Sequence, residues 1–138
     1  MIRQRYSLFL LLQAFVIIAV TMIFKSITDR QIAATVAGTL FIIIPVGLMF
    51  WEFKANKFNN KIWFAGALQF LILFALPIMG LRLLNWNVPF EYVSFLGIKG
   101  PALHEWSSRS YLVWMIITFI TSFKANQALK KKQKDLNI

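Results

Sequence analysis

The sequence predicts an all-α integral membrane protein, a four-helix bundle with an interfacial segment between its third and fourth helices. Its 138 residues are 59% hydrophobic and only 14% charged, which is too apolar for a soluble domain of this size. The stretch 32–51 runs for twenty residues without a charged side chain. At ~1.5 Å per residue it can cross a hydrocarbon core of ~30 Å. Three further apolar stretches complete a single transmembrane domain.

Composition also limits the chemistry. The chain has no Cys, so disulfides, thiolate metal sites and thiol redox chemistry are excluded. Its one His cannot supply the paired axial ligands of a membrane haem, and the sequence has no P-loop, dinucleotide fingerprint or nucleophile elbow. We therefore expect a non-enzymatic protein with no catalytic residues, no metal site and no cofactor.

The first helix is predicted over residues 7–24, as an uncleaved membrane anchor. Its apolar core is longer than that of a signal peptide, and no small-x-small cleavage site follows it. Thr28 and Gln31 have the spacing of a capping box, so the second helix is expected to begin at Asp29 or Arg30. A connection this short makes the first two helices an antiparallel hairpin.

The second helix is predicted over residues 31–52. Ala34 and Gly38 form a small-xxx-small pair, which lets a neighbouring backbone approach closely. Pro45 has no N–H to bond the carbonyl four residues earlier. We therefore expect a kink or a freed carbonyl in the second half of this helix.

The third helix is predicted over residues 62–84, with Gln69 and Arg82 as its polar members. The stretch 85–100 is too apolar for a solvated loop, and Pro and Gly interrupt it too often for a membrane span. We expect it to lie along the membrane interface. Its aromatic side chains would then lie at headgroup depth: Trp86, Phe90, Tyr92 and Phe95.

The fourth helix is predicted over residues 102–124, because Pro101 is a first-turn signal. This start places Glu105 and Arg109 one turn apart, in the order that favours an ion pair. A polar stripe is expected to face the bundle: His104, Ser108, Tyr111, Met115, Thr118 and Ser122. An apolar stripe is expected to face lipid: Trp106, Val113, Ile117 and Ile120.

The distribution of positive charge predicts the orientation. Of the fifteen Lys and Arg residues, ten lie at the N-terminus, around the loop after the second helix and in the C-terminal tail, and five lie on the other side. The positive-inside rule therefore places both termini in the cytoplasm, with the chain as a multi-pass protein of the bacterial inner membrane. Residues 125–138 form a basic tail, and its lysines are expected to contact the anionic inner leaflet: Lys130, Lys131, Lys132 and Lys134.

Charged and titratable side chains gather near the outer boundary of the membrane. With Lys99 beside them, they form the predicted outer polar cluster: Arg82, Glu91, His104, Glu105 and Arg109. Charge is costly to bury in a membrane, so two roles are open. In the structural role these groups snorkel, pair and set the depth of the helices. In the functional role they form a docking or ligand site, where Arg82 and Arg109 receive an anion and His104 titrates near neutral pH.

Three polar side chains lie within about two turns of the cytoplasmic ends of their helices. They form the predicted inner polar layer: Gln13, Gln69 and Thr118. Interhelical hydrogen bonds in membranes average only ~0.6 kcal/mol, so this layer is interpreted as helix packing in preference to a solute path. No carboxylate lies in the middle of a span, which disfavours a proton-coupled transporter.

The first hairpin reads RYSLFLLLQAFVIIAVTMIF, a short polar turn, and AATVAGTLFIIIPVGLMFWEF. Its main features are Gln13, Gly38, Pro45 and a basic loop after the second helix. Over about residues 6–54 this pattern resembles the opening half of bacterial ATP synthase protein I. Val46 stands where that family tends to have Asn, FAGALQF lacks the family's charged residues, and the outer segment has no counterpart. The resemblance implies a non-catalytic factor that helps the rotor ring of the F-type ATP synthase assemble.

These features predict an assembly or interaction factor for a membrane protein complex. A small transporter or channel is the alternative, and it would be oligomeric because four thin helices scarcely enclose a pore. A sensor on the outer face, built on residues 86–109, is a third possibility. The expected partners are the lipid bilayer and a membrane complex or a second copy of the chain. Nucleic acid is not expected, because the net charge of +10 is mainly a topology signal.

Overall fold

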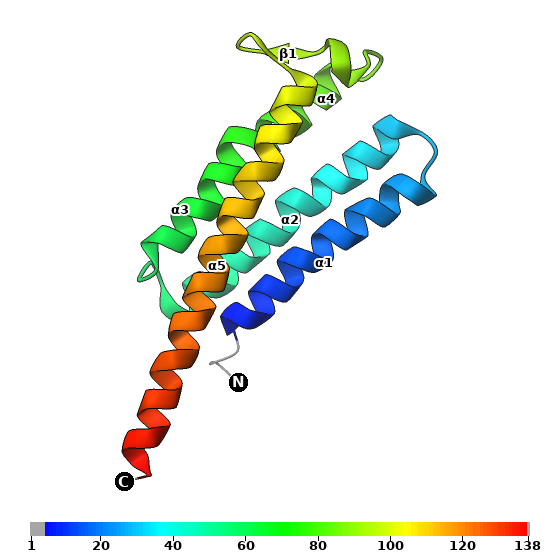
Figure 1. Cartoon of the computed structure of the whole chain (residues 1–138). Coiled ribbons are helices and arrows are strands. Elements are labelled where there is room, and N and C mark those ends of the chain that lie inside the picture. The colour runs from blue at the N-terminus through cyan, green and yellow to red at the C-terminus, as the bar shows by residue number, and fades with distance from the viewer. Residues whose placement is uncertain (1–4, 138) are drawn as a thin grey trace.

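A computed structural model describes residues 5–137, apart from the side chain of Phe90, and confirms the predicted bundle of four membrane-length helices (Figure 1). Its helical elements are α1 (Arg5–Ser26), α2 (Arg30–Asn56), α3 (Lys61–Phe70), the π-helix η2 (Leu71–Ala75), α4 (Leu76–Leu84) and α5 (Gly100–Leu136). The elements α3, η2 and α4 follow one another without a break and form one span. All four spans are long and apolar enough to cross a membrane, so the chain is a multi-pass membrane protein.

The bundle has two distinct ends. At the basal end, α1 begins and residues 57–60 join α2 to α3 (Figure 1). At the cap end, residues 27–29 join α1 to α2, and residues 85–99 join α4 to α5. The helix α5 leaves the bundle at the basal end, so Arg5 and Leu136 lie on the same side of the four spans.

The turn between α1 and α2 is closed by Asp29. Its carboxylate accepts hydrogen bonds from the backbone N–H groups of Gln31, at 2.9 Å, and Ile32, at 3.3 Å. The predicted start of this helix is therefore confirmed at Arg30, but the predicted capping role of Thr28 is wrong. A carboxylate at the N-cap position satisfies two free N–H groups and favours the positive end of the helix dipole. The helix α2 continues through the buried Pro45 without ending there.

The third span contains an unforeseen π-helical turn. In η2 the backbone N–H of Leu76 bonds the carbonyl of Leu71, five residues earlier. Pro77 follows at once, and it has neither an N–H to donate nor room for the carbonyl four residues before it. Widening the turn before a proline moves that carbonyl away from the ring, which explains why the π-helix lies here.

The segment between α4 and α5 contains a short β-hairpin at the cap end (Figure 1). Its strands pair antiparallel, and with the preceding 3-10 turn they are η3 (Phe90–Tyr92), β1 (Ser94–Phe95) and β2 (Ile98–Lys99). Leu96 and Gly97 have φ values of 52° and 82°, as a two-residue type I′ turn requires. Tyr92 and Leu96 are 77% and 87% exposed, which agrees with an interfacial segment. The predicted headgroup position of Phe90 concerns a side chain outside the described part of the structure.

The helix α5 is longer than predicted. The sequence places its end near residue 124, whereas the structure continues it to Leu136. The added residues are mostly Ala, Gln, Leu and Lys, which are strong helix formers even without tertiary contacts. The predicted basic tail is therefore a continuation of α5, which projects past the basal end of the bundle (Figure 1).

The core of the basal half is built from packed aromatic rings. Trp63 lies between Phe9 and Trp114, with ring centroids 5.4 and 5.6 Å away. Tyr111 continues the stack at 5.7 Å from Trp114 and packs against Phe70 at 5.0 Å. The five rings come from α1, α3 and α5, so they join three of the four spans in one cluster.

The predicted faces of α5 are confirmed in part. On the predicted bundle face, Tyr111, Thr118 and Ser122 are buried and Met115 is half-buried. His104 and Ser108 are exposed, but they line a cavity among the four spans, so they also face the bundle as predicted. On the predicted lipid face, three residues are exposed: Trp106, Val113 and Ile120. Ile117 was expected there and is instead half-buried, because it packs beside Gly66 on α3.

Candidate functional site

A buried charged network joins α1 to α2 at the basal end. Arg5 donates from Nε to Glu52 Oε2 at 3.0 Å and from Nη2 to Oε1 at 3.2 Å. The Tyr6 hydroxyl donates to the same Oε1 at 2.8 Å and accepts from Arg5 Nη2 at 3.0 Å. Glu52 is fully buried and Arg5 is only 9% exposed. The network is a bidentate pair completed by a phenol, which is a strong arrangement for a buried ion pair.

The sequence analysis missed this network, although the sequence holds a signal for it. In an antiparallel helical hairpin, residues equidistant from the turn lie opposite one another. Arg5 and Glu52 lie almost equally far from the turn at residues 27–29. A search for opposite charges at mirrored positions would have found the pair.

Thr118 is the centre of a buried hydrogen-bond group in the basal half. Its Oγ1 accepts from Gln13 Nε2 at 3.0 Å and from Trp63 Nε1 at 2.9 Å, and it donates to the carbonyl of Trp114 at 3.0 Å. A hydroxyl offers one donor and two acceptor lone pairs, so its capacity is used in full. Tyr111 adds a bond from its hydroxyl to the carbonyl of Gln13 at 2.8 Å. The predicted contact between Gln13 and Thr118 is confirmed, and Trp63 is the partner that the sequence analysis missed.

Gln69 does not join this group, so the predicted three-residue layer is wrong. Its Oε1 accepts from Ser110 Oγ at 2.6 Å, and its Nε2 donates to the carbonyl of Ser110 at 2.9 Å. Ser110 is eight residues from Thr118 on α5, about 12 Å along the axis at ~1.5 Å per residue. The ends of the spans are staggered, since Trp63 near the start of α3 is level with Gln13. Counting residues from each helix end therefore misjudged the depth of Gln69.

The predicted outer polar cluster divides into separate parts. Glu105 accepts from Arg109 Nη2 at 2.7 Å, which confirms the predicted ion pair. These two side chains are 63% and 70% exposed, and neither lines the cap-end cavity described below. Glu91 and Lys99 are exposed on η3 and β2. Arg82 and His104 are the members of the cluster that line the cap-end cavity described next.

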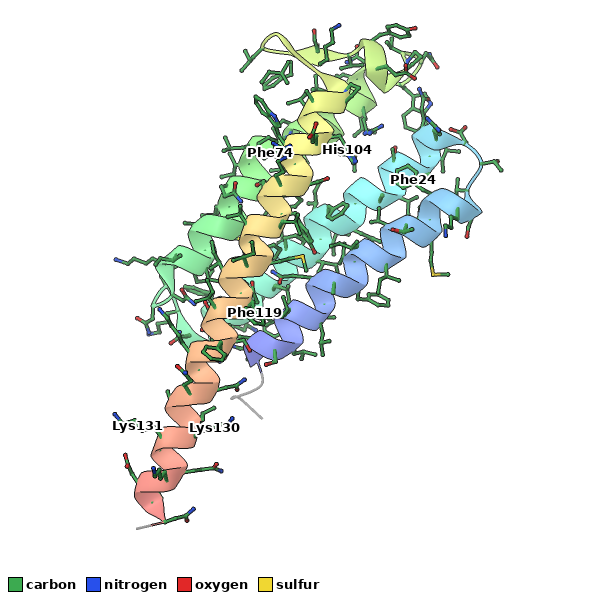
Figure 2. All side chains as sticks on the ribbon, viewed as in Figure 1. Phe24, Phe74, His104, Phe119, Lys130 and Lys131 are labelled. Atoms are coloured by element: carbon green, nitrogen blue, oxygen red, sulfur yellow. The ribbon has the colours of Figure 1, made fainter. Side chains whose placement is uncertain are left out.

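This cap-end cavity has a volume of about 410 Å³ and lies among all four spans. Most of its wall is apolar, and Phe70 and Tyr111 line its deep end, toward the aromatic cluster. Five polar side chains line the wall toward the cap end: Thr21, Arg82, His104, Ser107 and Ser108. In Figure 2 the labelled His104 on α5 faces the space between the two pairs of helices, with Phe24 on the opposite side.

Within residues 5–137, no group of three or more His, Cys, Asp or Glu side chains is placed to hold a metal ion. The fold and the polar groups define a multi-pass helical membrane protein, closed by aromatic packing at the basal end and hollow at the cap end. Comparison with family models, with curated proteins and with solved structures gave no match.

Proposed function

We propose that this chain is a non-enzymatic interaction or assembly factor for a membrane protein complex of the bacterial inner membrane. The observation that carries the proposal is the extension of α5 beyond the bundle (Figure 1). At ~1.5 Å per residue its 37 residues extend ~55 Å, against ~30 Å for a hydrocarbon core. About 25 Å of this length, nearly half of the helix, therefore exceeds the hydrocarbon core.

The extension presents two unlike faces. Lys124, Lys131 and Lys134 share one face by helical spacing, and Leu129 and Leu136 lie one heptad apart on another. Leu136 is 75% exposed and Leu129 is half-buried, so the bundle leaves the distal end of this apolar strip uncovered. A helix with an apolar strip beside positive charge suits a groove with acidic edges on a partner protein.

Contact with anionic lipid is the alternative use of the lysines. Lys130 and Lys134 lie about 9 and 15 Å beyond Lys124 along the helix axis. Surface charge is screened over a Debye length of ~8–10 Å at physiological salt. A helix that projects along this axis therefore carries its last lysines out of reach of the leaflet, which favours a protein partner. Figure 2 shows Lys130 and Lys131 on this projecting part.

Solute transport by one copy of the chain is less well supported. The aromatic cluster of Phe9, Trp63 and Trp114 fills the space between three spans in the basal half. The cap-end cavity stops at Phe70 and Tyr111, which belong to the same cluster. A solute that entered the cavity would meet packed rings in place of a path.

The partner complex that we propose is the F-type ATP synthase. The support for this choice is the resemblance of about residues 6–54 to ATP synthase protein I. Deleting the gene should lower the amount of assembled rotor ring in membranes, measured on native gels against total subunit content. Normal ring assembly in the deletion strain would exclude the F-type ATP synthase as the partner. The general proposal of an interaction factor for a membrane protein complex is tested by the next experiment.

The general proposal is tested with the four lysines of the extension: Lys130, Lys131, Lys132 and Lys134. Replacing all four by Gln should release the protein from a high-mass complex on native gels of gently solubilised membranes. Replacing them by Arg is the matched control and should keep the complex, because charge is retained. A wild-type chain that migrates only as a monomer or homo-oligomer would overturn the proposal.

Orientation is tested separately, because the docking surface must face the cytoplasm. Reporter fusions after Asn56 and after Lys132 should both report cytoplasm, and a fusion near Gly97 should report the outer side. An outer position for Asn56 would overturn the charge argument and, with it, the cytoplasmic partner.

A further inference from the structure

We propose that the cap-end cavity is a phospholipid site, which holds one acyl chain between the helices and the lipid phosphate at Arg82 and His104. The inference is independent of the proposed docking of α5. It rests on three features of the cavity: its apolar wall, the charge at one end of it, and the depth of that charge.

The apolar wall suits a hydrocarbon chain. The cavity of about 410 Å³ falls within the size range of small-ligand pockets. Ile17, Phe41, Ile78 and Leu112 supply apolar surface from four different elements, α1, α2, α4 and α5. Small residues on α2, such as Ala37, leave the space that a larger side chain would fill. A chain lying here would replace contacts with lipid by contacts with protein on several sides.

The charge at the cap end suits a phosphate. Arg82 and His104 line the cavity, and no acidic side chain is among its lining residues. A guanidinium carries five N–H donors in a planar fork that matches phosphate oxygens, so it can serve several acceptors at once. Glu105 is next to His104 in sequence, but its carboxylate pairs with Arg109. The wall is thus complementary to an anion at one end and to hydrocarbon along the rest.

The depth of Arg82 and His104 agrees with the position of a lipid headgroup. Arg82 is two residues before the end of α4, and His104 is four residues after the start of α5. Both therefore lie near the membrane boundary, level with the interfacial segment. Phe24 and Leu112 line the cavity and are 43% and 51% exposed, so the cavity borders the surrounding lipid. A lipid in the leaflet at the cap end would keep its phosphate at headgroup depth, and one of its acyl chains would enter the cavity between the helices.

Native mass spectrometry of the delipidated full chain, titrated in detergent with palmitoyl-oleoyl phosphatidylglycerol, tests the proposal. One lipid per chain is expected to bind in preference to further copies. Diacylglycerol with the same chains should bind at least tenfold more weakly, because it lacks the phosphate. Inorganic phosphate should not compete at equal concentration, because it lacks the chain. Equal binding of diacylglycerol would overturn the role of Arg82 and His104, and competition by phosphate would overturn the role of the apolar wall.

Two variants and one control place the site. Arg82→Gln should weaken binding of the phospholipid about tenfold or more, the scale of losing a hydrogen bond to a charged group. Ser108→Phe should reduce it similarly by filling the cavity. Arg109→Gln is the matched control at the same end of the bundle, and it should bind like the wild type because Arg109 does not line the cavity. Loss of binding in the control equal to that in Arg82→Gln would overturn the assignment.

The wild-type chain provides a test that needs no folded variant. A phosphatidylglycerol with a photoreactive acyl chain should label half-buried cavity residues such as Phe41 and Ile78 above lipid-facing residues such as Phe119, which is 58% exposed and does not line the cavity. Uniform labelling of all lipid-facing residues would contradict the proposal. Protection of the cavity residues by a crosslinked partner protein, with no lipid label, would overturn it in favour of a partner helix.

Discussion

The two halves of the bundle use the same four spans in opposite ways. In the basal half, Thr118 has every hydrogen-bonding position used, and aromatic rings fill the space around it. In the cap half, the spans enclose a cavity of about 410 Å³ with Arg82 and His104 on its wall. A dense half that holds the helices together leaves the other half free to remain hollow. Stability and binding are therefore separated along the bundle axis.

The largest expected loss of stability comes from removing the buried ion pair in the basal half. Glu52→Gln should leave the Arg5 guanidinium buried without a counter-charge, which costs about 3–5 kcal/mol in the free energy of unfolding. Glu105→Gln removes the exposed partner of Arg109 at the cap end, at a cost of about 0–1 kcal/mol. Unfolding by SDS in mixed micelles measures both. Equal losses in the two variants would contradict the difference in burial between the two ion pairs.

The next effect compares one glycine in each half. A Cβ at Gly66 would lie 3.0 Å from Ile117 Cδ1 and 3.2 Å from Trp114 Cδ1, inside the packed region. Gly66→Ala should therefore destabilise by about 1–3 kcal/mol, as overpacking does. A Cβ at Gly38 would meet Met79 Cε at 2.6 Å, but this is the end of a flexible side chain beside the cavity. Gly38→Ala should cost less, because the methionine can turn away.

Gly47→Ala is the control for both substitutions, because no atom lies within 4 Å of a Cβ built there. It should be neutral or stabilise by up to about 1 kcal/mol through helix propensity. Greater damage from Gly38→Ala than from Gly66→Ala, in the same unfolding titration, would reverse the proposed contrast between the halves.

A third effect concerns the hydrogen bonds of the basal half. Thr118→Val keeps the shape of the side chain but leaves Trp63 Nε1 and Gln13 Nε2 without their acceptor, so we expect a loss of about 1–2 kcal/mol. Thr121→Val is the matched control on the same helix, since its hydroxyl bonds only the carbonyl of Ile117 at 2.8 Å. The control should change stability by less than about 0.5 kcal/mol. Indole N–H exchange at Trp63, followed by NMR, should rise in Thr118→Val alone; an unchanged rate would contradict the assigned bond.

The sequence predicted those features that depend on local periodicity. The four spans follow from apolar length, and the pairing of Glu105 with Arg109 follows from a spacing of one turn on one helix. The start of α2 at Arg30 was also predicted, but from Thr28, whereas the capping residue in the structure is its neighbour Asp29. Each of these needs information from neighbouring residues only.

Features that depend on how the spans are staggered were not predicted. Gln69 was assigned to the wrong layer because α3 does not begin level with α1. To predict the pair of Arg5 and Glu52, one must know how α1 and α2 are aligned along their axes. To predict the cavity, one must know the angles at which all four spans pack. Side-chain partners across helices therefore had to come from the structure.

The smallest expected effect concerns the exposed pair of Glu105 and Arg109, and it tests whether the cap half is tuned for binding alone. Exchanging both residues, Glu105→Arg with Arg109→Glu, keeps the net charge and the i,i+4 spacing but reverses the favoured order along the helix. The exchange should cost only a few tenths of a kcal/mol in unfolding free energy. Neither residue lines the cap-end cavity, so binding of the anionic lipid should stay at the wild-type level. Unfolding titration and lipid titration of the same preparation separate the two effects. If the exchanged protein were less stable than both single variants, contacts other than the attraction of the two charges would hold Glu105 and Arg109 in place. The pair could then not serve as the exposed ion pair with which the buried pair of Arg5 and Glu52 is compared.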